Sequence, residues 1–331
     1  MTESFPQAKE IAYRDALRSA LEEEMAGDPT VVLIGEEVGR YGGAYGVSRG
    51  LLERFGEERV FDTPISEAAI VGTAIGAAMT GLRPVVELMY VDFVALAMDQ
   101  IANQAAKIRY MFGGQMAVPM VLRTQGGTGR SAGAQHSQSL EAWIMHTPGL
   151  RLAMPATVTD AYCLLREAIR SEDPVVFIEH KSLYTRKAPF DPSAALPWGR
   201  AAVRRCGSDA TLVTYSRMLT YALEAALKLE SDGIDLEVID LRTLNPLDMD
   251  TVNRSVNKTK RAVVVTEDSF TAGVSGELSA RIGESCFHTL EEPVVRVAAH
   301  DIPIPVAPAL EKAAIPSVVD IETAVSRLVK T

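Results

Sequence analysis

The sequence predicts an α/β protein made of two parallel-sheet domains, and two observations carry this prediction. Short apolar runs typical of buried strands alternate with helical patterns along most of the 331 residues, as in sheets whose parallel strands are joined by helices. The alternation lapses in the proline-rich stretch between Lys181 and Arg200, which is the best candidate for a linker. We therefore expect one domain over residues 1–188 and a second, smaller α/β domain over residues 200–331.

The elements of the first domain follow from the period of the apolar residues. Helical spacing is expected at residues 11–25, 94–110, 139–145 and 159–170, and buried strands at 30–35, 85–90, 118–123, 150–155 and 174–179. Between the first two strands lies a helix over residues 68–81 that consists largely of small residues, and Arg83-Pro84 ends it. A helix of this composition allows another backbone to approach closely.

The second domain repeats the same alternation. Strands are expected at residues 211–215, 236–240, 262–266 and 294–297, and helices at 218–230 and 273–283.

Composition narrows the class of protein. Hydrophobic residues make up 47% and charged residues 23%, which is typical of a soluble globular protein. The net charge of −10 disfavours nucleic acid and anionic membranes as partners. The three cysteines are far apart and lack metal-ligand spacing, which indicates a reducing compartment. The polar, acidic first 28 residues do not resemble a targeting peptide, so we expect a cytoplasmic location.

Two carboxylates are candidate functional residues. Glu67 follows the turn Asp62–Pro64 and is the single charge at the mouth of an otherwise apolar helix. A carboxylate there is costly to desolvate unless a ligand needs it, although a helix cap facing the positive end of the dipole explains it equally well. Glu36 directly follows a buried strand, at the end where open α/β sheets hold their ligands.

A glycine-rich loop and a histidine form the second candidate feature. Residues 126–133 read GGTGRSAG after a strand, but the spacing of the dinucleotide-binding fingerprint and its acidic residue are missing. His136 is the one histidine of five that follows such a loop, and we expect it at the start of a helix. A lone histidine is more often structural than catalytic. Its pairing with Glu67 at a neighbouring strand-to-helix junction predicts that both face one cleft.

Several long motifs carry a resemblance to a known family. The motifs are GEEVGRYGGAYGVSRGL, DTPISEAAIVGTAIGAAMTGLRPVVELMYVDF, AAKIRYMFGG, AGAQHSQSLEAW and NPLDMDTV. They resemble the β subunit of the thiamine-diphosphate-dependent first component of 2-oxo acid dehydrogenase complexes, a group that includes the pyruvate, branched-chain 2-oxo acid and acetoin enzymes. The similarity runs from about residue 10 to residue 329. It implies a pyrimidine-binding α/β domain followed by a transketolase-type C-terminal domain.

The resemblance also implies roles for individual residues. Glu67 matches the glutamate that hydrogen-bonds the aminopyrimidine ring of thiamine diphosphate, and Phe93 matches the aromatic residue that stacks on that ring. Further positions match residues beside the cofactor or lining the pyrimidine pocket: Glu36, Ile65 and Met89. His136 matches a histidine that serves acyl transfer to lipoamide.

Partners and ions follow from the same resemblance. In this family a GDG…N motif on the α subunit holds the diphosphate and magnesium, and that motif is absent here. The chain therefore holds half a site, which implies an α2β2 heterotetramer with an α subunit and delivery of the acyl group to a lipoyl-bearing dihydrolipoyl acyltransferase. Relatives also bind potassium through backbone carbonyls that match Met120, Ala168, Ser171 and Asp173. Here Ser171 replaces a usual aspartate and Asp173 a usual asparagine.

Four functions remain open on the sequence. The first is the β subunit of a decarboxylating 2-oxo acid dehydrogenase, of the pyruvate or branched-chain type. The second is an acetoin dehydrogenase β subunit, which RYMFGG and AGAQHSQSLEAW especially resemble. The third is a nicotinamide-dependent oxidoreductase that uses the loop at 126–133, and the fourth is a non-catalytic scaffold.

Overall fold

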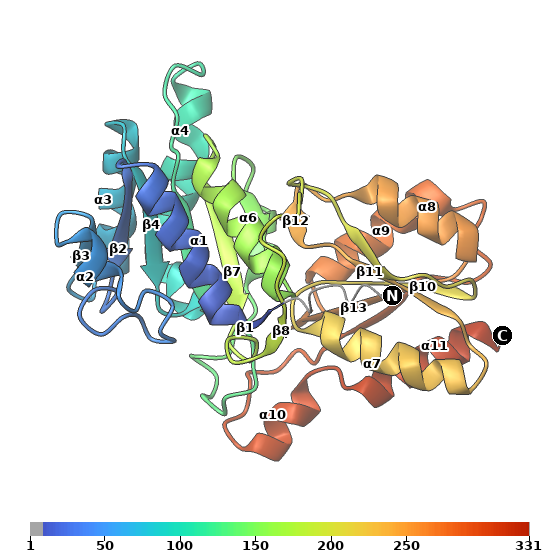
Figure 1. Ribbon diagram of the computed structural model, residues 1–331. Helices are drawn as coiled ribbons and strands as arrows, with labels where there is room; N and C mark the ends of the chain where they lie inside the picture. Colours follow the sequence, from blue (N-terminus) through green and yellow to red (C-terminus); the bar gives the residue numbers. More distant parts are fainter. Residues whose placement is uncertain (1–8, 331) are drawn as a thin grey trace, which may run out of the picture.

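The computed structural model describes residues 9–330, which form two α/β units lying side by side (Figure 1). The sheet of the first unit has seven strands, in the order β12 (Thr243–Asn245), β6 (Arg151–Ala153), β7 (Val175–His180), β5 (Val121–Gly126), β4 (Arg83–Leu88), β2 (Val31–Gly35) and β3 (Val60–Asp62). All neighbours in it run parallel except β12, which is antiparallel to β6. This edge strand comes from the second half of the chain.

The sheet of the second unit has five strands, in the order β14 (Val295–Ala299), β13 (Ala262–Ser269), β10 (Ala210–Thr214), β11 (Leu236–Asp240) and β9 (Ala202–Arg205). It is also parallel except at one edge, where β9 runs antiparallel to β11. A separate antiparallel pair joins β1 (Glu10–Ala12) to β8 (Lys187–Pro189). The predicted fold class is confirmed, and each sheet adds one antiparallel edge strand that the sequence patterns did not predict.

Alternation along the strands decides which helices cover which face of the first sheet. Val31 and Leu33 pack in one apolar cluster with α1 (Tyr13–Gly27) and α6 (Val158–Arg170). Val32 and Ile34 point to the opposite face, into a cluster with α3 (Glu67–Met79). Successive strand residues face opposite sides, so strands buried on both faces read as continuous apolar runs.

The cluster under α3 continues into the second unit. There it includes residues of α8 (Met249–Thr259) and α9 (Val274–Cys286), so one apolar core spans both halves of the chain. The other face of the second sheet is covered by α7 (Met218–Ser231) and α11 (Val318–Val329). The remaining α-helices of the described residues are short: α2 (Leu51–Phe55), α4 (Ala106–Met111), α5 (Glu141–Met145) and α10 (Pro308–Ala314). None of the helices within residues 9–330 is long and apolar enough to cross a membrane.

Residues 94–110 do not form the single α-helix that the sequence predicts. The chain forms a 3₁₀ segment, η1 (Val91–Ala97), then a π-helical turn, η2 (Gln100–Ala105), and then α4. The buried apolar residues Val91, Val94 and Ala97 recur every third position, which matches the three residues per turn of a 3₁₀ helix. Packing against α3 therefore overrides the expected helical period.

Two boundaries also differ from the prediction. The helix expected at residue 139 begins at Glu141, so His136 lies in a turn rather than at a helix start. The first part of the expected linker is packed into the first unit, where Tyr184 is buried and donates a hydrogen bond to Glu179. The domain bounds 1–188 and 200–331 stay a prediction, and residues 1–8 and 331 lie outside the described range.

Candidate functional site

Four neighbouring strands of the first sheet bring the candidate residues to one edge. β2, β4, β5 and β7 are parallel, so their carboxyl ends lie along the same side. Glu36 follows β2, Phe93 lies just beyond β4, His136 follows β5 after the glycine-rich loop, and Lys181 follows β7. This is the edge at which open α/β sheets bind ligands.

The two predicted carboxylates lie close enough to influence each other. Glu67 is the first residue of α3, and both Glu67 and Glu36 are only 8% exposed. Burial raises the pKa of Glu36, and the negative charges of Glu67 and Glu37 raise that pKa further. The Oε1 atom of Glu36 is buried and has no hydrogen-bond partner among the described residues. Because buried polar atoms are normally paired, a carboxylate in this state fits a site that a polar ligand group completes.

Aromatic rings surround the imidazole of His136. The ring centroids of Phe93 and His136 are 5.4 Å apart at an interplanar angle of 86°, and those of Tyr90 and His136 are 5.3 Å apart at 73°. Such edge-to-face contacts fix ring orientation. Lys181 donates a hydrogen bond to the carbonyl oxygen of His136 and lies 5.2 Å from the centre of the Tyr90 ring. Burial lowers the pKa of Lys181.

The two remaining pocket residues differ in exposure. Ile65 precedes α3 and is 80% exposed, whereas Met89 follows β4 and is half-buried. An isoleucine left this exposed beside a buried carboxylate presents apolar surface that a ligand or a partner chain can cover.

The sequence analysis missed a buried ionic group beneath this edge. Arg123 on β5 donates to both carboxylate oxygens of Glu179 on β7, at 2.7 and 2.8 Å, and to Glu87 on β4 at 2.8 Å. All three side chains are at most 3% exposed. Burial raises the pKa of Glu179 despite the attraction of Arg123. Charged residues inside otherwise apolar strands were the signal that could have revealed this group.

The backbone positions predicted for potassium are occupied by internal hydrogen bonds. The carbonyls of Met120 and Ala168 accept backbone N–H groups, and that of Asp173 accepts the Ser171 hydroxyl. The carbonyl of Ser171 accepts the guanidinium of Arg83 at 3.1 Å. A potassium site here stays a prediction.

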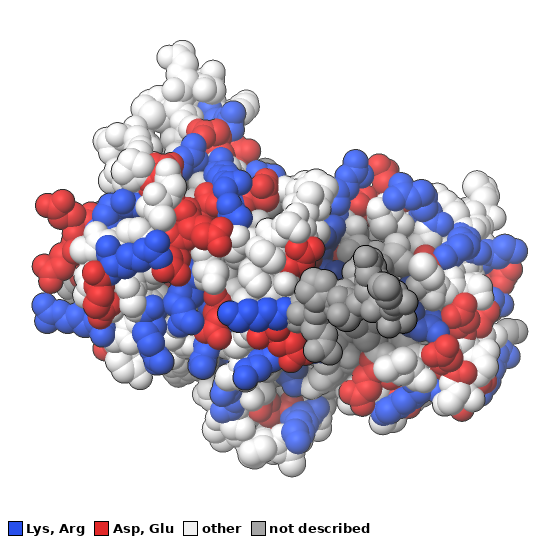
Figure 2. All heavy atoms as spheres, in the orientation of Figure 1, with Lys and Arg blue, Asp and Glu red and all other residues white. Residues whose placement is uncertain are grey.

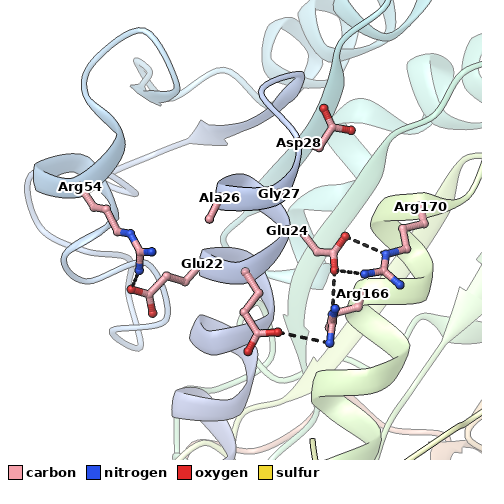
Figure 3. Close-up of a pocket in the computed structure, with 9 residues that line it drawn as sticks. Glu22, Glu24, Ala26, Gly27, Asp28, Arg54, Arg166 and Arg170 are labelled. Carbon is pink, nitrogen blue, oxygen red and sulfur yellow. Dashed lines mark hydrogen bonds and ion pairs between the residues drawn. The ribbon is translucent and has the colours of Figure 1, made fainter. Parts of the chain in front are cut away.

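A large polar cavity lies elsewhere, at the carboxyl end of α1 and so near the start of β2 (Figure 3). Its charged side chains pair with one another: Arg54 with Glu22, and both Arg166 and Arg170 with Glu24. Because these charges already have partners, the cavity does not call for an ionic ligand. It also lies at the opposite edge of the sheet from Glu36 and His136.

Comparison with protein-family models divides the chain into two matched regions. Residues 9–187 match the family described as "Transketolase, pyrimidine binding domain", and residues 199–321 match "Transketolase, C-terminal domain". Among solved structures, the chain is similar to one titled "Split gene transketolase, inactive beta4 tetramer", with a TM-score of 0.80 and 24% identity over 97% of this chain and 98% of the other. At that identity the likeness concerns the fold alone.

Curated relatives are more similar in sequence. The chain is 49% identical to "Pyruvate dehydrogenase E1 component subunit beta-2, mitochondrial" of Oryza sativa subsp. japonica, covering 97% of this chain and 86% of that one. It is 46% identical to "Pyruvate dehydrogenase E1 component subunit beta" of Rhizobium meliloti (strain 1021), covering 97% and 71%. It is 43% identical to "Acetoin:2,6-dichlorophenolindophenol oxidoreductase subunit beta" of Cupriavidus necator, covering 98% of both chains.

Proposed function

This chain belongs to the thiamine-diphosphate-dependent family of E1 β subunits, enzyme subunits that include those of pyruvate dehydrogenase and an acetoin-oxidising relative, and we propose that it supplies the pyrimidine-binding half of the cofactor site in a pyruvate dehydrogenase. In this role it takes part in decarboxylating the 2-oxo acid and in passing the acyl group to lipoamide. The family assignment favours this chemistry over the nicotinamide-dependent oxidoreductase and the non-catalytic scaffold.

One observation carries the proposal: one edge of a parallel sheet brings together four candidate residues, namely Glu36, Glu67, Phe93 and His136. There the Oε1 atom of Glu36 is buried and has no hydrogen-bond partner among the described residues. A heteroaromatic ring with ring nitrogens and an amino group fits such a place, because it offers polar atoms to carboxylates and a face to Phe93. The fit concerns the pyrimidine half only.

Within this site the residues have separate tasks. The bound cofactor supplies an electron sink for the bond that breaks beside the substrate carbonyl. Glu67 holds a proton at a pyrimidine ring nitrogen, and its place at the start of α3 in a low-dielectric setting strengthens that hydrogen bond. Phe93 packs against the ring and Glu36 lies beside it, while Ile65 and Met89 line its edge.

His136 serves the second half of the reaction in this proposal. Its ring is held by Phe93 and Tyr90, and it is only partly buried. An imidazole so placed remains accessible to an incoming lipoyl arm. Handing a proton to a dithiolane sulfur as the ring opens is general-acid catalysis, for which histidine is the usual residue.

The proposed partner is an α subunit, in an α2β2 assembly. Two surfaces support it. The outer side of α3 exposes Ala69, Thr73 and Gly76, which allow another backbone to approach. The tip at α4 projects from the first unit, and its outermost part is uncharged (Figures 1 and 2). It exposes three large apolar side chains: Tyr110, Met111 and Phe112. Exposed apolar surface of this kind marks interaction sites.

Three finer points belong to the same proposal. Magnesium and the diphosphate are held by the α subunit. The lipoyl-bearing dihydrolipoyl acyltransferase accepts the acyl group, in a cytoplasmic complex. If potassium binds through Met120, Ala168, Ser171 and Asp173, potassium chloride raises the melting temperature of the chain more than an equal concentration of sodium chloride.

Turnover by the reconstituted enzyme tests the substrate. The chain is combined with its α subunit, thiamine diphosphate and magnesium, and assayed with pyruvate, a branched 2-oxo acid and acetoin, with 2,6-dichlorophenolindophenol as electron acceptor. Fastest turnover of pyruvate, with carbon dioxide released, is the expected result. The 43% identity to the Cupriavidus necator β subunit along 98% of both chains favours acetoin as the second candidate. Preferred turnover of acetoin without carbon dioxide would replace pyruvate with it.

A further inference from the structure

The loop that carries His136 is held from the other half of the chain. The loop is closed at its base by a backbone hydrogen bond of 2.9 Å, in which Gly127 N–H donates to the carbonyl of Gln138. Within it, the N–H groups of Thr128, Gly129 and Ser131 donate to two carboxylates of the second unit. These carboxylates belong to Glu267 on β13 and Glu311 on α10, which we call the carboxylate clamp.

Glu267 binds the start of the loop. Its Oε1 atom accepts from Thr128 N–H at 2.7 Å and from the Thr128 hydroxyl at 2.8 Å. Its Oε2 atom lies 2.9 Å from Nε2 of His180. Ser182 donates its backbone N–H to Nδ1 of His180, so Nε2 carries the proton of the neutral ring and donates it to Glu267. Burial lowers the pKa of His180, which favours that neutral ring.

The charge of Glu267 is stabilised where it lies. Burial by itself would raise the pKa of this carboxyl, but the hydrogen bond from His180, the positive charge of Arg217 and the Thr128 N–H hold it below its usual value. Arg217 also donates to the Thr128 hydroxyl oxygen at 3.0 Å. Glu267 is therefore a fixed anion at neutral pH, and it accepts three hydrogen bonds from Thr128 and His180 of the first unit.

Glu311 binds the middle of the loop. Its Oε1 atom accepts from Gly129 N–H at 2.9 Å, and its two oxygens share the Ser131 N–H at 3.2 Å each. Glu311 is 4% exposed. Hydrogen bonds to an ionised acceptor are roughly twice as strong as neutral ones, and backbone N–H groups left without a partner in a buried place are costly.

The shape of the loop depends on these contacts. Gly127 has a φ of +81°, and a Cβ on it would lie 2.1 Å from Nε2 of His180. Gly129 has a φ of +92°, a conformation that glycine adopts at little cost. A chain this permissive loses more entropy than others on ordering, so its conformation relies on the acceptors that the second unit supplies.

We propose that Glu267 and Glu311 are positioning residues for the reaction: through the loop they set the place of the His136 imidazole, so the second domain controls the acyl-transfer geometry. The inference about the reaction rests on the proposed role of His136. The effect of the clamp on the order of the loop can be measured without substrate.

Amide hydrogen exchange of the assembled αβ enzyme tests the clamp. In Glu311→Gln the carboxylate charge is lost, and one of the two oxygens that bind the N–H groups of Gly129 and Ser131 becomes an amide NH₂ group, which cannot accept a hydrogen bond. The peptide covering residues 127–138 is expected to exchange about tenfold faster, a loss of about 1.4 kcal/mol of protection. Glu237→Gln is the matched control: Glu237, on β11, is also buried in the second unit, and it accepts hydrogen bonds from Gly207, Ser255 and Lys258 of the same unit. Unchanged exchange in Glu311→Gln, or equal acceleration in the control, would overturn the clamp.

Two assays test the consequence of the clamp for catalysis: acylation of a lipoyl domain and turnover with an artificial electron acceptor. Glu311→Gln is expected to lower kcat for acylation of a free lipoyl domain about tenfold at an unchanged KM for the 2-oxo acid. Its rate with an artificial electron acceptor should stay within about twofold of the wild type, because neither Glu36 nor Glu67 touches the clamp in any described hydrogen bond. Equal loss in both half-reactions would refute positioning of His136.

A milder variant guards against misfolding. Thr128→Val removes the hydroxyl that links Glu267 to Arg217 and leaves the backbone N–H in place. It should show the same pattern with a smaller, about threefold, change, and no change in either exchange or acylation would count against the clamp. His136→Ala tests the role of His136 separately from the role of the clamp. If it leaves acylation intact while Glu311→Gln still loosens the loop, the role of His136 fails and the clamp stands.

Discussion

Replacing Arg123 by methionine removes the one cation among three buried charges beneath the candidate site. The guanidinium makes two hydrogen bonds to Glu179 and one to Glu87. Breaking a buried ion pair by removing one partner costs about 3–5 kcal/mol. Glu179 retains the Tyr184 hydroxyl at 2.5 Å and Glu87 retains the Gln125 amide at 3.1 Å. With one donor left on each carboxylate, we expect a loss near the lower limit, about 3 kcal/mol.

Urea unfolding at neutral pH, followed by circular dichroism, measures this loss. The triple variant Arg123→Met, Glu87→Gln, Glu179→Gln is the control, because it removes the uncompensated charges along with the guanidinium. It should recover more than half of the lost stability, since burying neutral groups costs far less than burying charges. A loss below about 1 kcal/mol in Arg123→Met, or no recovery in the triple variant, would show that the three charges are not coupled as the distances indicate.

Three further predictions follow from other parts of the structure. Burial raises the pKa of Glu141 to about 8 from its ordinary 4.5, so the stability linked to its proton is complete below pH 4.5 and is lost as the pH rises through 8. The variant Glu141→Gln keeps an acceptor for Tyr215 and cannot ionise. It should need more urea to unfold than the wild type at pH 8, and the difference should be smaller at pH 5. His136→Ala should lower lipoyl acylation at least tenfold and leave hydrogen exchange at the thiazolium carbon unchanged, as measured by nuclear magnetic resonance; a parallel loss in both would remove its separate role. A Cβ at Gly76 meets no atom within 4 Å, so Gly76→Gln should stabilise the isolated chain by up to about 1 kcal/mol. The same variant should weaken assembly with the α subunit, as measured by light scattering. Intact assembly would show that the outer side of α3 is not part of the interface.

Local patterns were enough to predict the main strands and to single out as candidates two carboxylates that the structure shows to be buried. Glu67 stood out as a single charge at the start of an apolar helix, and Glu36 as a carboxylate at a strand end. Helices α8 and α11 were missed although their caps were readable: Asp248 accepts from Thr251 N–H, and Ser317 forms a capping box with Asp320. These signals were present in the sequence and were overlooked.

Other features depend on partners far along the chain, which periodicity does not report. The 3₁₀ path at residues 91–97 arises from packing on α3, so the local helical pattern gave the wrong period. Glu267 and Thr128 are 139 positions apart, and Glu311 and Gly129 are 182 apart. The acidic residues and the glycine-rich loop were visible in the sequence, but nothing local indicated that they meet. The family resemblance contributed the role of Phe93, which residue patterns alone did not suggest.

The central claim is that Glu67 holds the pyrimidine ring in its reactive state, and hydrogen–deuterium exchange at the thiazolium carbon measures this most directly. The assembled αβ enzyme with thiamine diphosphate and magnesium is compared with Glu67→Gln, which is nearly isosteric and uncharged. Glu37→Gln is the control, because the neighbouring Glu37 is exposed and the charge change is the same. We predict that exchange slows by about 10²–10⁴-fold in Glu67→Gln and stays unchanged in Glu37→Gln. Equal exchange in Glu67→Gln and the wild type would contradict the claim and leave Glu67 as a helix cap.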